Sequence, residues 1–437
     1  MRYLIITLLI IISNVLSAQT EVEYEVINTP IGTASSPAEA EVKLELIERF
    51  QHYNSRTTSS NDHFDKNINS PKSALFSPDD KKLYVQSLEG YETLVYSADS
   101  FEKIKVIEHV FDKGDTMLFQ DTSVFDYKYR YRRSDFNIFS GKPVESTFSH
   151  DGKYLWVTYY RRSFDKNAVS PSGVAIINTE NDSIVRVMPT GPLPKMIAAS
   201  PNNKYVAVTH WGDNTIGIID ISSNDPQSFK YVKQFVVDKK MKLDFDPEEK
   251  VDRDNGCGFC LRGTVFTPQG DYLLVGRMGG NGGIAIFNMD SLEYKGSVWG
   301  MKINIRHLVI NNDWLILSSN IPGYVQKAKY QDVINARLNC DSKMCYFKEW
   351  ESVFAGKGLR TISASSDGKY IFACANNESK IAVVRSSDMK VISEIPVDSF
   401  PVGMDLSNND KLLVVTSQGR SSVGGGNSVM VFKVEYP

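Results

Sequence analysis

One short phrase returns seven times along this chain of 437 residues. Each copy has an apolar residue, a small polar residue, a turn built from Pro, Asn, Asp or Gly, and then an apolar run. The copies are FSPDDKKLYV at 76–85, FSHDGKYLWV at 148–157, ASPNNKYVAV at 199–208, FTPQGDYLLV at 266–275, a shortened INNDWLIL at 310–317, ASSDGKYIFA at 364–373 and LSNNDKLLVV at 406–415. Because Asn, Asp and Gly supply the backbone conformations of tight turns, each copy predicts two strands joined by a turn. Seven β units of one kind can close into a ring.

The spacing of the copies predicts the size of the repeated unit. The small polar residue of each copy, called here the anchor residue, recurs after 42 to 72 residues. The anchor residues are Ser77, Ser149, Ser200, Thr267, Asn311, Ser365 and Ser407. The shortest intervals match the ~40–50 residues of a four-stranded propeller blade, and longer ones leave room for insertions. We therefore predict an all-β fold, a seven-bladed β-propeller of four-stranded antiparallel blades, with insertions near 111–140, 238–256 and 321–357.

The seventh unit lacks its fourth strand, which indicates how the ring closes. The third unit predicts strands at 196–199, 205–209, 215–220 and 231–237, and the sixth at 361–364, 370–375, 380–385 and 391–395. After the seventh anchor, strands are predicted only at 412–416 and 428–434. The segment 42–47 alternates polar and apolar residues before the first anchor. We expect it to complete the last blade, which would remove an exposed sheet edge.

The first eighteen residues have the pattern of a secretory signal peptide. Arg2 precedes an apolar run from Leu4 to Ile12, and the small residues Ser17 and Ala18 follow. The run is too short to span a bilayer, and no second apolar segment suggests a transmembrane span. We therefore expect residues 1–18 to be removed, residues 19–437 to form a single propeller, and the protein to be exported to the periplasm or the cell surface. The net charge of −3 gives no case for nucleic-acid binding.

Four of the five cysteines form two close pairs. Cys257 and Cys260 stand in CGFC, and Cys340 and Cys345 stand in CDSKMC. Two local disulfides, a four-thiolate zinc site and a redox dithiol are the alternatives. Local disulfides are favoured because the second spacing does not fit a zinc ribbon and a βαβ context for a redox motif is lacking. Cys374, inside an apolar strand, is expected to be a buried free thiol.

The repeats resemble those of the YVTN-type β-propellers, a seven-bladed superfamily that includes lactonase-like proteins. The segments LPKMIAASPNNKYVAVTHWGDNTIGIID at 193–220 and LRTISASSDGKYIFACANNESKIAVV at 359–384 carry the resemblance. It implies the fold over nearly all of the chain, although the fifth unit is degenerate. Such propellers include enzymes, cofactor carriers and binding scaffolds, so the resemblance does not select an activity.

Aligning the repeats brings five cations to one position. Five residues before the anchor stand Lys72, Val144, Lys195, Arg262, Arg306, Arg360 and Val402. Equivalent positions in a propeller encircle the axis, so these cations predict an anion site at a mouth of the channel, with His307 beside Arg306. The alternative is that this loop position tolerates long solvated side chains.

A second basic stretch lies in the first insertion, from Tyr127 to Arg133. With period two, Lys128, Arg130 and Arg132 would share one face of a strand and the tyrosines the other. Together with Arg133, these residues are candidates for binding a protein, glycan or lipid headgroup. The alternative is an edge strand protected by its charges.

Catalytic and metal signals are weak, which favours binding over chemistry. The six histidines show no zinc-ligand spacing, so no metal site and no cofactor are expected. The sequence thus predicts an exported, monomeric, non-catalytic scaffold for an anionic small molecule, glycan or protein. The alternatives are a lactonase-like hydrolase whose site joins Arg306, His307, Arg360 and His210 at the channel mouth, and a cofactor-bearing electron-transfer propeller, against which the absence of C-x-x-C-H counts.

Overall fold

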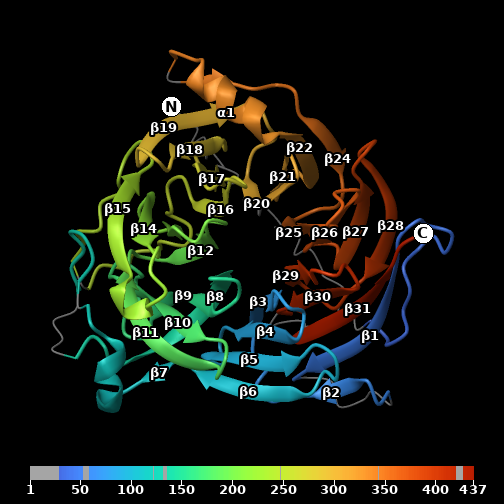
Figure 1. Ribbon diagram of the computed structural model, residues 1–437, viewed down its shortest axis with the longest axis horizontal. Coiled ribbons are helices and arrows are strands. Elements are labelled where there is room, and N and C mark those ends of the chain that lie inside the picture. Colours follow the sequence, from blue (N-terminus) through green and yellow to red (C-terminus); the bar gives the residue numbers. More distant parts are fainter. Residues whose placement is uncertain are drawn as a thin grey trace, which may run out of the picture.

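Seven sheets stand around a central axis in the computed structural model, as predicted (Figure 1). The structure describes residues 29–52, 59–121, 123–130, 135–246, 248–342, 344–419 and 427–437. Each sheet is one blade, numbered here by its anchor residue along the chain. The all-β, seven-bladed prediction is confirmed.

The first four blades follow one another along the chain. Blade 1 contains β3 (Pro71–Phe76), β4 (Lys82–Ser87), β5 (Glu92–Ser97) and β6 (Lys103–Glu108). Blade 2 contains β8 (Phe139–Ser149), β9 (Tyr154–Arg162), β10 (Ser172–Asn178) and β11 (Ser183–Thr190), with β7 (Val110–Phe111) added beside β8. Blade 3 contains β12 (Pro194–Ala199), β13 (Tyr205–His210), β14 (Thr215–Asp220) and β15 (Lys230–Val236). Blade 4 contains β16 (Leu261–Phe266), β17 (Tyr272–Arg277), β18 (Ile284–Asn288) and β19 (Glu293–Trp299), with β23 (Cys345–Tyr346) at its outer edge.

The remaining blades complete the circle. Blade 5 contains β20 (Ile305–Asn311), β21 (Trp314–Ser319), β22 (Tyr324–Lys329) and β24 (Glu351–Phe354). Blade 6 contains β25 (Leu359–Ala364), β26 (Tyr370–Ala375), β27 (Lys380–Arg385) and β28 (Lys390–Pro396). Blade 7 contains β29 (Pro401–Leu406), β30 (Leu412–Ser417), β31 (Ser428–Glu435), β1 (Lys43–Gln51) and β2 (Asp62–Phe64). The helices are α1 (Tyr330–Leu338) and the 3-10 turns η1 (Lys113–Leu118) and η2 (Pro226–Ser228).

The repeated phrase owes its residue types to a hydrogen-bonded turn. In blade 3 the Ser200 hydroxyl accepts from the Tyr205 backbone N–H at 2.8 Å and donates to the Asn202 side chain at 2.7 Å. Blades 1, 6 and 7 repeat both bonds with Ser77, Ser365 and Ser407. The third residue after each of these anchors has a positive φ, which explains why Asp, Asn or Gly stands there.

The same turns also connect one blade to the next. The Asp80 carboxylate of blade 1 accepts from the backbone N–H groups of Asn408 and Asn409 of blade 7, at 2.7 and 2.9 Å. In the same way, Asp410 of blade 7 accepts from the Ser366 N–H of blade 6 at 3.0 Å. Polar residues of the phrase therefore join blade 7 to both of its neighbours and also stabilise the turn within a blade.

An N-terminal strand closes the ring, which confirms the prediction for 42–47. β1 pairs antiparallel with β31, from Lys43 opposite Glu435 to Gln51 opposite Ser428, and Figure 1 shows the two strands side by side. Leu44 and Leu46 are fully buried in the core that blades 6 and 7 share. The buried Arg49 of β1 pairs with Asp62 and with Asp398, whose Oδ1 lies 3.2 Å from Nη1. The repeats did not predict this ionic clamp or the parallel strand β2.

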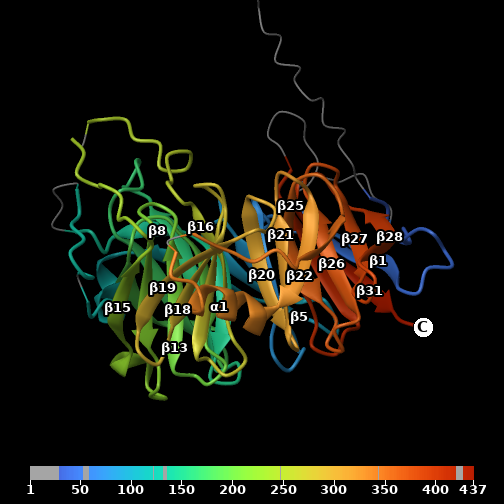
Figure 2. The same cartoon turned by 90° about the horizontal axis from the view of Figure 1, so that it is seen from above.

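Two of the three insertions rise from the same face of the ring. The segments between β7 and β8 and between β15 and β16 extend to one side in Figure 2. The third insertion holds α1, which packs against blade 4, where Arg337 Nε donates to Lys295 O at 2.5 Å. Among the described residues, no helix has the length and apolar character needed to cross a membrane. The expected signal peptide, residues 1–18, lies outside the described residues.

Replacing Leu44 with Ala should weaken the closure of the ring. The fully buried side chain packs between blades 6 and 7, so the substitution should lower the free energy of unfolding by about 2–5 kcal/mol. Chemical denaturation of the whole chain measures this. The exposed neighbour Lys43 gives the control, since Lys43→Ala should change stability by less than about 0.5 kcal/mol. Equal effects of the two variants would contradict closure by β1.

Candidate functional site

Every inner strand begins with an irregularity at the position that the repeat alignment singles out. The pairing of β3 with β4 shifts between Pro71 and Ala74, which brackets Lys72, and that of β12 with β13 shifts between Pro194 and Met196, which brackets Lys195. The other five inner strands shift at the equivalent place. A bulge bends its strand and redirects a side chain. Each of the five cations therefore lies at a bulge of its inner strand.

The backbone at this position is fixed by the neighbouring blade. The Ser73 hydroxyl donates to Val144 O at 2.9 Å, Thr361 donates to Val402 O at 3.0 Å, and Ser318 donates to Arg360 O at 2.6 Å. Arg262 Nη1 donates to Lys195 O at 2.8 Å, and Thr416 donates to Lys72 O at 3.2 Å. Adjacent blades therefore hold these residues in fixed relative positions.

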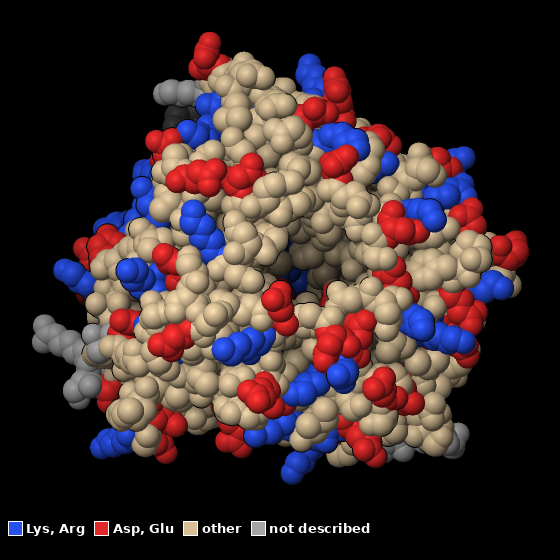
Figure 3. Space-filling view, in the orientation of Figure 1, with Lys and Arg blue, Asp and Glu red and all other residues tan. Residues whose placement is uncertain are grey.

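All five cations converge on one cavity of about 450 Å³ at the axis of the ring. We call Lys72, Lys195, Arg262, Arg306 and Arg360 the cation ring. The other lining residues are Leu88, Glu89, Lys142, Val144, Tyr160, Arg161, Trp211 and Gln418. The space-filling view shows the hollow at the centre of the molecule, with basic side-chain atoms inside it (Figure 3). Seven lining residues are basic and one is acidic.

Carboxylates compensate only part of this charge. Arg262 Nη2 lies 2.5 Å from Glu145 Oε1, and Lys195 Nζ lies 2.5 Å from Asp254 Oδ1. Lys142 pairs with Glu89 at 2.6 Å. Within the described part of the chain, Lys72 and Arg306 form no ion pair. The nearest polar contact of Arg306 is the Met278 sulfur, 3.6 Å from Nη1.

The uncompensated charge changes the acidity of the lysines. Burial lowers the pKa of Lys72 well below its ordinary value, and the positive charges of the three ring arginines lower it further. Burial first, and then the charges of the same three arginines, also lower the pKa of Lys195. An anion beside these lysines would raise their pKa values by offsetting the charge of the arginines, so the cavity favours a negatively charged occupant.

The two histidines considered for a hydrolytic site lie elsewhere. His307 Nδ1 accepts from the Ile362 N–H at 3.4 Å, and burial lowers its pKa to about 4. His210 lies between the Thr190 and Thr215 hydroxyls, each 2.8 Å away, and burial lowers its pKa to about 3. Neither lines the cavity. The arrangement of a base beside Arg306 and Arg360 is therefore not found, although Arg306 and Arg360 do come together.

The basic and aromatic segment of the first insertion is not a strand where the structure describes it. Residues 127–130 are irregular because Tyr127 turns inward and its hydroxyl donates to Asp213 at 2.5 Å. The edge-strand alternative is therefore wrong there. Arg130 pairs with Asp244 of the second insertion at 2.6 Å, and Lys128 is exposed. Arg132 and Arg133 lie outside the described residues.

The two insertions enclose a second cavity of about 1390 Å³. Its lining includes Lys128, Arg130, Lys240, Lys242, Phe245 and Arg253. Three aromatic rings of the lining already make cation–π contacts within the protein. Lys240 lies 4.5 Å from the ring centroid of Tyr127, Arg253 lies 4.8 Å from that of Phe245, and Arg277 lies 3.9 Å from that of Phe259.

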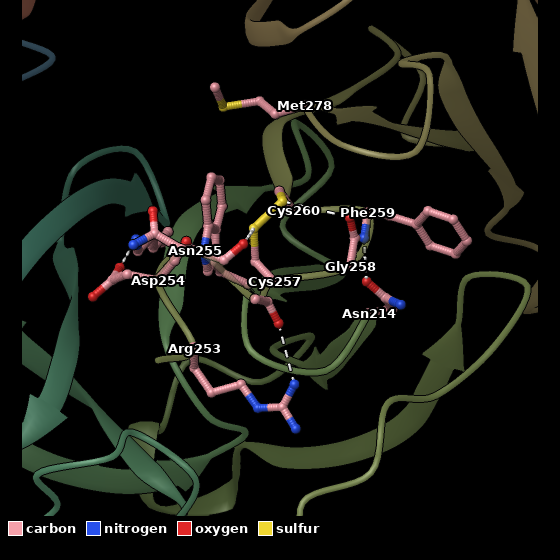
Figure 4. The surroundings of a disulfide bond; sticks show 12 residues. Asn214, Arg253, Asp254, Asn255, Cys257, Gly258, Phe259, Cys260 and Met278 are labelled. Carbon is pink, nitrogen blue, oxygen red and sulfur yellow. Dashed lines mark hydrogen bonds and ion pairs between the residues drawn. A yellow bond between two sulfur atoms is a disulfide. The ribbon is translucent and has the colours of Figure 1, made fainter. Parts of the chain in front are cut away.

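Both predicted disulfides are present. Cys257 is joined to Cys260 and Cys340 to Cys345, while Cys374 is a buried free thiol, as expected. Figure 4 shows the first disulfide among the residues that support its loop. Arg253 Nη1 donates to Gly256 O at 3.1 Å, and Asn214 Oδ1 accepts from the Phe259 N–H at 2.8 Å. Arg253 and Phe259 of this loop line the larger cavity, and the loop also carries Asp254.

Repeat analysis did not identify four residues of the site. Glu145 follows the ring position directly in blade 2, but the other blades have no acid there. Tyr160, Trp211 and Asp254 come from a strand end and from loops that differ between blades. A pattern shared by seven units cannot reveal a residue that occurs in one.

Comparisons with known proteins agree on the fold. No protein-family profile matches the chain. A segment of 177 residues is 25% identical to Antigen Lp49 of Leptospira interrogans; it covers 35% of this chain and only 38% of that relative. Among solved structures, the chain is similar to the hydrazine synthase of Kuenenia stuttgartiensis, with a TM-score of 0.57 and 12% identity over 87% of this chain and 99% of that one. The propeller domain of Cps50 (Swd1) from Myceliophteria thermophila gives a TM-score of 0.55 and 12% identity over 84% of this chain and 97% of the domain. At this identity the likeness shows the β-propeller fold and nothing about activity.

Counting thiols should distinguish the disulfides from free or metal-bound cysteines. Protein unfolded without reductant should react with a thiol reagent at Cys374 alone, and prior reduction should expose all five cysteines. Mass spectrometry of the labelled protein measures both. Labelling at five positions without reductant would contradict both disulfides.

Proposed function

We propose that this propeller binds a small organic anion at the cation ring, as a binding scaffold without chemistry of its own. One observation carries the proposal. Five cations from five blades line one cavity of about 450 Å³, and two of them lack a counter-ion among the described residues.

The energetic cost of this arrangement supports a bound anion. Like charges held together in a partly buried cavity repel one another; burial is the largest cause of the lowered pKa values of Lys72 and Lys195, and the positive charges of the ring arginines lower them further. A structural role would be better served by a neutral side chain. Perturbed groups gathered in a cavity are typical of functional sites.

The size of the cavity favours a metabolite over a macromolecule. Sites for small molecules usually occupy about 300–1,000 Å³. The arginines offer paired N–H donors, which suit a carboxylate or a phosphate. Tyr160, Trp211 and Val144 supply an apolar portion of the wall, so the ligand would combine anionic groups with a carbon skeleton.

Several untested expectations from the sequence belong to the same proposal. The repeat phrase supports a YVTN-type propeller, and the two disulfides suit an oxidising compartment, in line with a signal peptide and export to the periplasm or cell surface. Lys128 and Arg130 border the larger cavity, where a protein or glycan partner could bind. A lactonase-like activity gains no support from the positions of His307 and His210.

Replacing Arg306 with Gln should weaken anion binding while sparing the fold. The guanidinium has no carboxylate partner among the described residues, so its removal relieves repulsion and should leave the melting temperature unchanged or higher. The affinity for citrate, measured by isothermal titration calorimetry at low salt, should fall about tenfold or more.

The matched control is Arg385→Gln, which removes the same charge from a residue paired with Glu41 and Asp388, away from the cavity. Its citrate affinity should stay within about twofold of the parent protein. Binding that Arg306→Gln leaves unchanged, or a parent protein that binds no anion, would refute the proposed function.

Raising the pH should weaken anion binding, and it should do so at pH values lower than those at which lysines ordinarily lose their charge. The pKa of Lys72 is lowered in the free protein, so its charge is lost as pH rises through that lowered value, and binding would require proton uptake. Lys72→Arg should retain the charge and flatten the decline between about pH 7 and about pH 10. Lys81→Arg, at a fully solvated turn position, should follow the parent protein. Parallel pH profiles for parent and Lys72→Arg would contradict this assignment.

A further inference from the structure

Asp254 presents a carboxylate to the cation ring from outside the blades. Its Oδ1 lies 2.5 Å from Lys195 Nζ, and its Oδ2 accepts a hydrogen bond from the Tyr160 hydroxyl. Lys195 and Tyr160 both line the axial cavity. Each oxygen of one carboxylate is therefore held by a different donor of the candidate site.

The loop holds Asp254 at this place by several independent contacts. Trp211 Nε1, from another cavity-lining residue, donates to the backbone carbonyl of Asp254 at 3.0 Å. Asp252 accepts from the Asn255 N–H at 3.1 Å and closes the turn (Figure 4 shows Asp254 and Asn255 beside the disulfide). The disulfide follows at once, and Cys257 is buried in an apolar cluster with Trp211. The backbone is thus anchored while the side chain ends at the cavity.

The carboxylate itself is not buried. The side chain of Asp254 is 45% exposed, against 14% for Lys195. A rotation about its side-chain bonds would return it to water, where a carboxylate is well solvated, whereas Lys195 is held over the Trp211 ring with Nζ 4.2 Å from the centroid. The Asp254 carboxylate can therefore move away from the cavity, whereas the Lys195 ammonium group stays in place.

A purely structural ion pair is the alternative reading of the contact. Such a pair would neutralise Lys195 permanently and leave the rest of the cation ring to act. Partial exposure speaks against it, because a solvated pair contributes little to stability and would not need three anchoring contacts. The geometry matches what a bound carboxylate ligand would need.

We propose that Asp254 is a tethered competitor that occupies the carboxylate subsite of the cation ring until a ligand replaces it. The inference rests on the proposed anion binding and deepens it. The ligand is a carboxylate-bearing organic anion, one carboxylate of which takes over Lys195 Nζ and the Tyr160 hydroxyl. Asp254 thereby sets a threshold affinity, so that weak or singly charged anions fail to displace it.

The test compares citrate binding to the full chain in three forms by calorimetry at low salt. Asp254→Asn keeps the shape of the side chain but removes the competing charge, and it should bind citrate about tenfold more tightly than the parent protein. Asp99→Asn makes the same change of net charge at an exposed turn of blade 1 and should stay within about twofold. Tyr160→Phe in the Asp254→Asn background should remove part of the gain, because the ligand would lose the hydroxyl donor.

The outcomes separate this inference from the proposed function. One outcome overturns the competitor role but leaves the proposed anion binding intact. In it, Asp254→Asn binds citrate no more tightly than the parent, while Arg306→Gln binds citrate more weakly. Tighter citrate binding by Asp254→Asn than by the parent supports both proposals, and an absence of binding by both forms overturns both. An equal gain for inorganic phosphate would overturn the carboxylate assignment, since only charge would then matter.

Discussion

The candidate site depends on hydrogen bonds that join neighbouring blades near the axis. Ser73, Thr361, Ser318 and Thr416 donate across a blade boundary to a carbonyl at the repeat position that carries the cation ring, and Arg262 does so with its own guanidinium. Burial of apolar side chains packs each blade against the next, and the directional bonds near the axis add fixed contacts between the inner ends of neighbouring blades. Without these bonds the five cations would still lie near the axis, but their positions relative to one another would not be fixed.

The cation ring works against the stability of the fold that positions it. Lys72 and Arg306 enter a partly buried space without a described counter-ion, and the lysine loses proton affinity as a result. A rigid scaffold can tolerate this because its core lies between the blades, where residues such as Leu44 and Phe372 are fully buried. The apolar core between the blades thus stabilises the fold, while the cations at the axis are available for binding. Glu145 and Asp254 moderate the repulsion at Arg262 and Lys195, and the uncompensated remainder is available to a ligand.

Much of the architecture could be predicted because the sequence repeats. The anchor residues located the turns, their spacing gave seven blades, and the missing outer strand pointed to 42–47. The ring position was also found this way, since the bulge recurs in every inner strand. His307 illustrates a limit: it adjoins Arg306, yet neighbouring residues leave a strand on opposite sides, so only one of them faces the cavity. The segment 127–130 shows another, because its alternation predicted a strand whereas the buried hydroxyl of Tyr127 determines its path. Asp254 lies in a loop without counterparts, and only the folded structure relates it to Lys195.

Closure by β1 determines when, during synthesis of the chain, the cavity can form. Blade 7 combines strands from both ends of the described chain, since β1 pairs with β31. The first cation of the ring, Lys72, is synthesised early and must wait for blade 7 before it has a neighbour on that side. A growing chain on the ribosome can stack blades one after another, but it cannot form a closed cavity from them. The cavity therefore closes only once β31 has been made and can pair with β1.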